Sequence, residues 1–185
     1  MNLIIYSHPS KNGHCGVILD QVVKNLKKSK QKFELLDLYA MKYNPIVSLK
    51  ELNPKGGVFP SKESIKFQEK ISKANKLIFI YPVWWGVMPA ILKGFFDRVL
   101  TAGFAYNYVN HIPKGCLNKK AIVFMTSGSP KLILTIMGNR PKKNIARDIL
   151  GFCGVKTKVY QFCSARNLNS KKENILRKKI NKIIR

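Results

Sequence analysis

KLIFIYPVWWGVMPAILKGFFDRVL, residues 76–100, contains a strand pattern, a loop pattern and a helix pattern in that order. Lys76–Tyr81 is apolar on both faces, which is typical of a strand buried inside a parallel sheet. Pro82–Gly86 holds both tryptophans of the chain and predicts a turn. Pro89–Leu100 has apolar residues at helical spacing, and its proline falls in the first turn, where a missing N–H costs little. The stretch therefore predicts one strand–loop–helix unit of an α/β sheet.

The same alternation continues on both sides of this unit. Further strands are predicted at Asn2–Tyr6, Lys32–Leu38, Lys119–Met125 and Val155–Cys163. Further helices are predicted at Gly16–Leu26, Ser61–Ala74, Lys142–Phe152 and Ser170–Ile184, and a loop at Met41–Pro60. This order favours an α/β fold with a flavodoxin-like, doubly wound, five-stranded parallel sheet in three layers. We expect residues 1–185 to form a single domain.

The composition is strongly basic. The chain has 34 Lys and Arg against 9 Asp and Glu, a net charge of +25. Such a field attracts nucleic acid, anionic lipid or phosphorylated small molecules. The lysines are spread along the chain without a zinc-finger or RNP-like pattern, so the sequence favours a solvated lysine coat over a nucleic-acid partner.

The cysteines indicate a reducing compartment, and the apolar runs indicate neither a signal peptide nor a membrane span. The 4 cysteines show no CxxC spacing, and with the 3 scattered histidines they predict no metal site. MNLIIYSHPS, residues 1–10, lacks the basic leader of a signal peptide, and the longest apolar run is too short for a membrane span. We therefore expect a cytoplasmic protein.

Three loops are the candidate ligand site. Ligands of an open parallel sheet bind beyond the carboxyl ends of its strands, which selects Ser7–Cys15, Pro82–Gly86 and Thr126–Ser129. The first loop is rich in hydroxyl and N–H donors and precedes a helix N-terminus, which suits a phosphate. The second offers aromatic surface for a flat ligand, or else buries its rings in the core or a subunit interface. The third is small enough for the backbone to approach a ligand.

Nucleophilic catalysis is not indicated. The sequence has no GxSxG motif, which argues against an α/β-hydrolase. Cys15 lies near the predicted phosphate loop, but Gln21 stands where the phosphatase spacing CX5R requires arginine.

These loops together resemble the flavodoxin-like NAD(P)H:quinone oxidoreductases. The most specific similarity is Pro89–Val99, PAILKGFFDRV, followed by Gly103–Tyr106. Ser7–Pro9 and Thr126–Ser129 are similar to the flanking loops of the family. The resemblance covers most of the chain, from Met1 to Gly154.

The resemblance implies a non-covalently bound flavin, FMN or alternatively FAD, with NAD(P)H as co-substrate. It implies a ping-pong, two-electron hydride transfer to a quinone or another small acceptor, without a catalytic side chain, since the flavin carries the chemistry. The implied cofactor-binding residues are His8, Ser10, Asn12, His14 and Cys15 at the phosphate side, Pro82, Val83, Trp84 and Trp85 along the ring, and Thr126, Ser127, Gly128 and Ser129 at the polar edge of the ring.

The resemblance also implies a homodimer. Two alternatives share the fold: a regulatory flavoprotein subunit with a peripheral membrane or transporter contact, and an FMN reductase or azoreductase. The sequence departs from the family pattern at Ser129, which replaces a glycine, and in residues 130–138, which lack the expected tyrosine. The acceptor and the preference for NADH or NADPH therefore stay open.

Overall fold

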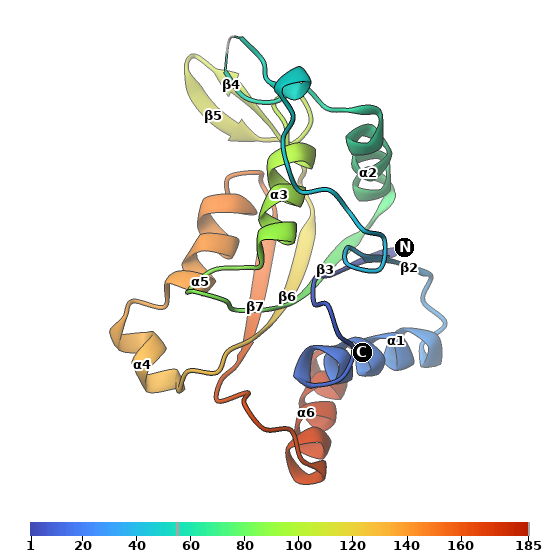
Figure 1. Ribbon diagram of the computed structural model, residues 1–185. Coiled ribbons are helices and arrows are strands. Elements are labelled where there is room, and N and C mark those ends of the chain that lie inside the picture. Colours follow the sequence, from blue (N-terminus) through green and yellow to red (C-terminus); the bar gives the residue numbers. More distant parts are fainter. Residues whose placement is uncertain (55, 185) are drawn as a thin grey trace.

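A computed structural model describes residues 1–54 and 56–184 (Figure 1). Lys55, within the predicted loop Met41–Pro60, and Arg185 lie outside the described residues. The elements follow one another as β1 (Asn2–Tyr6), α1 (His14–Lys28), β2 (Phe33–Asp37), the 3₁₀ turn η1 (Leu49–Glu51), α2 (Lys62–Lys73), β3 (Lys76–Pro82), α3 (Ala90–Val99), β4 (Tyr106–Val109), β5 (Ile112–Gly115), β6 (Lys120–Thr126), α4 (Lys131–Ile136), α5 (Arg140–Lys143), the π-helical segment η2 (Asn144–Ile149), β7 (Lys156–Phe162) and α6 (Ser170–Ile183).

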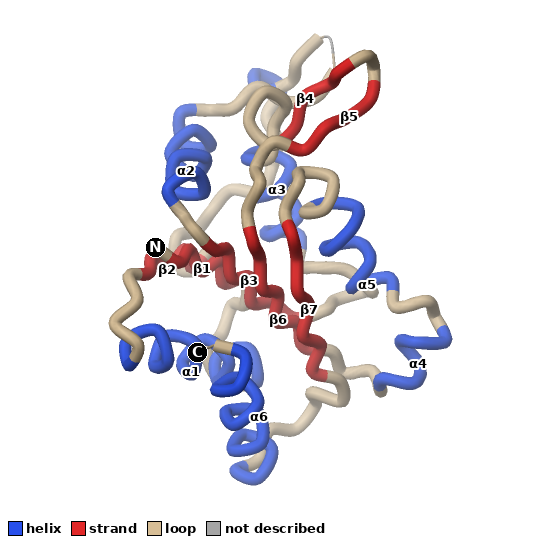
Figure 2. The backbone as a smooth tube through the Cα atoms, turned by 180° about the vertical axis from the view of Figure 1, so that it is seen from behind, coloured by secondary structure: helices blue, strands red, loops and turns tan. Residues whose placement is uncertain are grey.

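Five parallel strands form the central sheet in the order β2-β1-β3-β6-β7. The predicted α/β class and the flavodoxin-like parallel sheet are confirmed. Because the order reverses direction at β1 and β3, the loops that follow β1, β3 and β6 emerge side by side at one edge of the sheet (Figure 2).

Helices cover both faces of the sheet, which is why the central strands β1 and β3 are almost continuously apolar. Alternate residues of β1 and β3, such as Ile4 and Ile78, pack with α1 and α6 on one face. Their neighbours Leu3 and Leu77 pack with α2, α3 and the segment around Ile145 on the other face. The sheet therefore lies between two layers of helices, and the predicted three-layer arrangement is confirmed (Figure 1).

Three elements differ from the sequence prediction. The hairpin β4–β5 was not predicted, because its turn consists of Asn110 and His111, both at positive φ, in place of the usual glycine. The short helix α4 was not predicted either. The helix predicted at Lys142–Phe152 is partly π-helical, and this wider turn brings Ile145 and Leu150 onto the same buried face.

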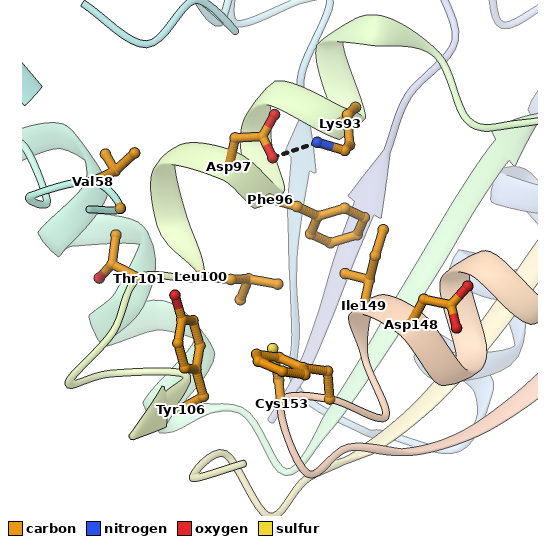
Figure 3. A pocket seen from close by; sticks show the side chains of 12 residues that line it. Val58, Lys93, Phe96, Asp97, Leu100, Thr101, Tyr106, Asp148, Ile149 and Cys153 are labelled. Carbon is orange, nitrogen blue, oxygen red and sulfur yellow. Dashed lines mark hydrogen bonds and ion pairs between the residues drawn. The ribbon is translucent and has the colours of Figure 1, made fainter. Parts of the chain in front are cut away.

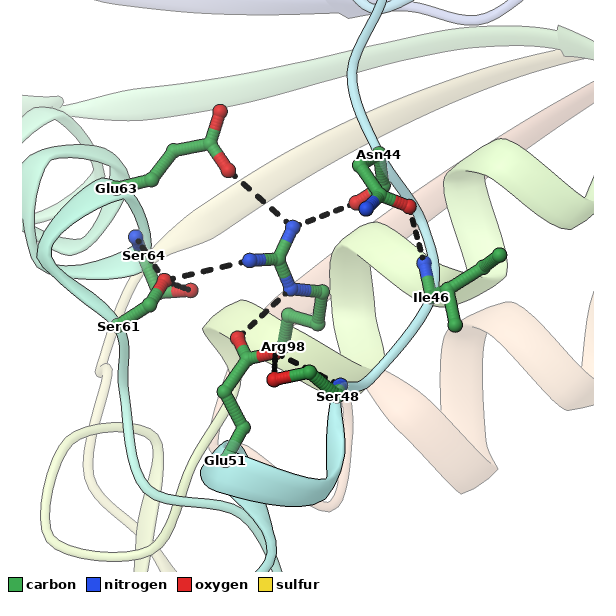
Figure 4. A network of polar contacts seen from close by, with 8 residues as sticks. All are labelled: Asn44, Ile46, Ser48, Glu51, Ser61, Glu63, Ser64 and Arg98. Carbon is green, nitrogen blue, oxygen red and sulfur yellow. Dashed lines mark hydrogen bonds and ion pairs between the residues drawn. The ribbon is translucent and has the colours of Figure 1, made fainter.

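Arg98 of α3 holds the long loop between β2 and α2 in place (Figure 4). Arg98 is 7% exposed, and its guanidinium lies 2.9 Å from Glu51 and 3.2 Å from Glu63. It also donates to the carbonyl oxygen of Asn44 at 2.5 Å and lies 5.4 Å from the ring centre of Tyr43. Arg98 therefore has a packing role, since a buried cation is tolerated only when it is paired.

The pKa of Glu51 is set by opposing effects. Burial alone would raise it, but hydrogen bonds from Ser48 and the ion pair with Arg98 outweigh burial and hold the pKa below its ordinary value. A carboxylate whose pKa is lowered on folding stabilises the fold at neutral pH, and this stabilisation is lost as the pH falls through the folded-state pKa.

We predict that Glu51→Gln lowers the free energy of unfolding by about 3 kcal/mol at pH 7, because it leaves a buried cation underpaired. Glu63→Gln is the matched control: the Glu63 side chain is 49% exposed, so the loss is expected to stay below about 1 kcal/mol. Urea unfolding at pH 7 and at lower pH measures both losses, and the Glu51 effect should shrink as the pH falls. Equal losses for the two variants would contradict this account.

Candidate functional site

The three predicted loops are fixed against one another by backbone hydrogen bonds beyond the strand ends. Ser7 N donates to Ile80 O at 2.9 Å, Val83 N to Thr126 O at 2.7 Å, and Ser127 N to Phe162 O at 2.9 Å. The ladder of the sheet thus continues into the loops. All three predicted segments are therefore brought together at the carboxyl edge of the sheet.

The first loop folds over the start of α1. Nδ1 of His8 lies 2.6 Å from Ser10 O and 3.0 Å from Ser10 N, so the loop backbone fixes the imidazole ring. Asn12 N donates to Ser10 Oγ at 3.0 Å, and the Tyr6 hydroxyl donates to Ser10 O at 2.8 Å from below. His8 and Ser10 are half-buried and Asn12 is exposed, so all three line the loop.

The N-terminus of α1 is open to an anion. Its N-cap is Gly13, no side chain of the described residues caps it, and its first turn has no acidic residue. The N–H groups of such a turn carry a partial positive charge. Gly16 lets the loop lie on the helix, because a Cβ there would be 1.6 Å from Lys11 O.

Two predicted residues point away from this opening. Cys15 is 3% exposed, and its Sγ lies 3.3 Å from Thr126 Oγ1; burial raises the pKa of this thiol to about 11, so it is protonated at pH 7. His14 faces the neighbouring α6. Burial, together with the charge of Lys172, lowers the pKa of His14, so its ring is neutral at pH 7.

The two tryptophans occupy a tight turn. Trp84 and Val87 exchange two backbone hydrogen bonds of 2.9 and 3.1 Å, with Trp85 and Gly86 between them at φ of 51° and 77°. The left-handed conformation costs roughly 1–2 kcal/mol for a residue with a side chain. The turn points the two rings in different directions: Trp84 lies 6.1 Å from the His8 ring, between ring centres, and Trp85 is fully exposed. Such strain is typical of functional loops.

The other predicted residues complete the wall of the site. Pro82 is buried and Val83 is half-buried at the end of β3. In the third loop, Ser129 N donates to Ser127 Oγ at 3.2 Å, and Gly128 lies exposed beside the Arg166 side chain. The sequence analysis missed Arg166, since nothing near it marks a site.

Two pockets flank the three loops. One, of about 420 Å³, lies between the tryptophan turn and α4; its lining includes Trp85, Val87, Leu134, Met137 and Arg140. The other, of about 470 Å³, lies between α1 and α6; its lining includes His14, Lys131, Gln161, Lys172 and Lys179. Gln161 Nε2 is buried without a partner among the described residues. Most of these residues were missed because they come from α4, β7 and α6, far from the loops in sequence.

A further hollow of about 260 Å³ lies at the other end of α3 (Figure 3). Its lining includes Phe96, Leu100, Tyr106 and Cys153, and its charged pair, Lys93 and Asp97, is satisfied internally at 2.5 Å. None of the three loops reaches it. The candidate site is therefore the carboxyl edge of the sheet.

Within the described residues, no group of three His, Cys, Asp or Glu side chains could hold a metal ion. In the same part of the chain, no helix is long and apolar enough to cross a membrane.

Known proteins with the same arrangement identify the family. A family model described as having a flavodoxin-like fold matches residues 2–184. The chain belongs to this family. The resemblance inferred from the sequence is thereby confirmed.

Individual relatives share this similarity. The chain is 39% identical over 166 residues to an uncharacterized NAD(P)H oxidoreductase of Haemophilus influenzae, covering 86% of this chain and 81% of the relative. It is 33% identical over 175 residues to NAD(P)H dehydrogenase [quinone] 1 of Cavia porcellus, covering 82% of this chain but only 64% of the relative. The solved NAD(P)H:quinone oxidoreductase from Methanothermobacter marburgensis superposes with a TM-score of 0.85 at 25% identity, covering 98% and 95% of the two chains.

We predict that Gly16→Ala destabilises the protein by about 3 kcal/mol, because its methyl group would collide with the Lys11 backbone. Gly128→Ala is the matched control, since its Cβ would meet only the Arg166 side chain at 3.7 Å, and we expect a change of about 1 kcal/mol or less. Thermal unfolding of both variants checks this. Equal melting temperatures would show that the loop does not pack on the helix as described.

Proposed function

We propose that this protein is a flavin-dependent NAD(P)H:quinone oxidoreductase. One observation supports this proposal most strongly. The uncapped N-terminus of α1, the turn that holds both tryptophans and the hydroxyl-rich loop Thr126–Ser129 lie together at one edge of the sheet. Two relatives, the quinone dehydrogenase of Cavia porcellus and the quinone oxidoreductase of Methanothermobacter marburgensis, carry that activity in their names. The second of these spans nearly the same length as this chain.

The donors of the site suit a flavin. The N–H groups at the start of α1, together with Ser10 and Asn12, would hold the phosphate. Trp84, fixed beside His8, would form one wall of the ring, and the backbone around Gly128 would donate to the polar edge of the ring. A bound flavin supplies the redox chemistry, receiving a hydride from NAD(P)H and passing it to a quinone in separate half-reactions.

The chain's own side chains bind and orient rather than react. The Cys15 thiol is buried and protonated at pH 7, so it offers no thiolate nucleophile. An apolar surface for a flat acceptor is formed by the exposed ring of Trp85 together with Val87, Leu134 and Met137. An acceptor that lies on this surface would displace water from it.

The pocket between α1 and α6 favours FAD over FMN. It begins at His14, beside the phosphate loop, and its lysines would receive a second phosphate. The unpartnered Gln161 Nε2 supplies a free donor at its floor. FMN would leave this pocket empty, whereas the adenylate half of FAD would fill it.

A second copy of the chain would cover the exposed apolar surface. The tip of the β4–β5 hairpin exposes Tyr108, Val109 and Ile112, and α4 exposes Leu132 and Ile136. Exposed apolar surface of this kind marks interaction sites. We therefore propose a homodimer, and sedimentation equilibrium should give twice the 21.1 kDa chain mass; a monomer at micromolar concentration would reject it.

We predict different losses for the two tryptophans. Trp84→Ala should weaken flavin binding about tenfold, because it removes the wall of the ring, which is worth roughly 1–2 kcal/mol. Trp85→Ala should mainly raise the KM for a quinone such as menadione. Phe59→Ala, which removes an exposed aromatic ring from the loop between β2 and α2, is the control and should change neither quantity.

Flavin fluorescence titration and steady-state NAD(P)H oxidation measure these quantities. If an azo dye or free FMN is reduced and quinones are not, the azoreductase or FMN reductase alternative holds. Unchanged flavin binding and quinone KM in both tryptophan variants would place the site elsewhere.

We predict that the wild-type protein binds FAD more tightly than FMN and that Lys172→Gln/Lys179→Gln removes this difference. The control, Lys171→Gln/Lys178→Gln, makes the same charge change on α6 at residues that do not line the pocket, and should keep the preference. Isothermal titration with each flavin tests this. Equal affinity of the wild type for both flavins would show that the pocket takes no adenylate group.

A further inference from the structure

Three lysines stand in a row at the amino ends of three neighbouring strands. Lys76, Lys120 and Lys156 are the first residues of β3, β6 and β7, and they are direct partners in the register of the sheet. Neighbouring strands lie about 4.8 Å apart, so the three Cα atoms span roughly 10 Å. Because side chains alternate along a strand, the three lysines share one face of the sheet, and Lys158 lies on that face two residues further along β7.

This row has no counter-charge in the described part of the chain. Eight of the nine acidic residues form ion pairs, all with other cations. The ninth, Glu69, lies on α2, which packs on the opposite face. Like charges directly opposite on adjacent strands destabilise a sheet. The row is thus a cost to the fold unless an anion neutralises it.

The lysines border a pocket of about 570 Å³, a volume typical of small-molecule sites. Its lining adds Ile122 of β6, Tyr160 of β7 and Ile183 from the end of α6. Tyr160 is half-buried, and its ring stacks on Phe124 with 5.7 Å between ring centres and 27° between planes. One rim is therefore cationic, while the floor is aromatic and aliphatic.

We propose that this pocket binds a phosphorylated ligand of nucleotide size, with its phosphates along Lys76, Lys120 and Lys156 and its base against Tyr160. A chain of two or three phosphates bridges neighbouring lysines of the row, and the flat base lies on the apolar floor. The pocket is at the opposite end of the strands from the three loops, so it is separate from the flavin site. Its recognition elements do not depend on the proposed redox activity.

The test compares Lys120→Gln with Lys66→Gln. Lys120 is the middle lysine of the row, and Lys66 is an exposed lysine of α2 on the other face. Isothermal titration and thermal unfolding at physiological salt, with flavin-saturated protein, use ATP, adenosine and inorganic triphosphate as probes; the salt suppresses diffuse attraction to the basic surface.

We expect ATP to bind the wild type and Lys66→Gln equally and to raise the melting temperature of both. Lys120→Gln should have the higher melting temperature without ligand, because repulsion in the row is relieved, and its affinity for ATP should fall at least about tenfold. Lys156→Gln should behave in the same way. A variant that is more stable without ligand yet binds ATP more weakly identifies a ligand site, because loss of a merely structural lysine would not combine these two effects.

Three results would overturn the proposal. ATP binding that survives Lys120→Gln and Lys156→Gln would place ATP elsewhere, including at the flavin face. An equal loss in Lys66→Gln would show a diffuse field. Inorganic triphosphate that binds as tightly as ATP would show that the floor with Tyr160 recognises no base.

Discussion

The hydrogen-bond ladder that runs past the strand ends is the constraint on which the site depends. Three backbone bonds, from Ser7, Val83 and Ser127, join segments that are far apart in sequence. They exist because the strands are parallel and neighbouring, so all carboxyl ends meet at one edge. The sheet thus places the three loops beside one another, and contacts within each loop, such as those of His8 with Ser10, orient its side chains. A loop set this rigidly can present backbone donors to a ligand without reorganising.

The groups that line the opening between the three loops are suited to binding rather than to covalent chemistry. The opening is made of N–H groups, hydroxyls and aromatic rings, and Cys15 is buried and protonated at pH 7. Such a site can hold and orient a cofactor, and Cys15 offers no thiolate for nucleophilic chemistry. The strained Trp85 conformation fits this role, because it holds a large apolar ring in solvent, where a ligand can use it.

The sequence predicts what local patterns determine. The strand Lys76–Pro82 could be predicted because burial on both faces of the sheet requires a continuous apolar run. The helix after Ser61 could be predicted because a serine N-cap marks its start. The β4–β5 hairpin was not predicted, because the residues of its turn adopt positive φ without being glycines. Helix α4 was not predicted, because it is short and largely exposed. The three loops could be selected by topology, but the lysine row required strand register, which no single segment encodes.

The central claim is that the carboxyl edge of the sheet holds a flavin. The most direct test is the visible absorption spectrum of the purified protein, before and after addition of FMN and FAD, followed by removal of unbound flavin. The account predicts a flavin spectrum with one bound flavin per chain. A protein that stays colourless after both additions would contradict it and leave a basic binding protein on the same scaffold.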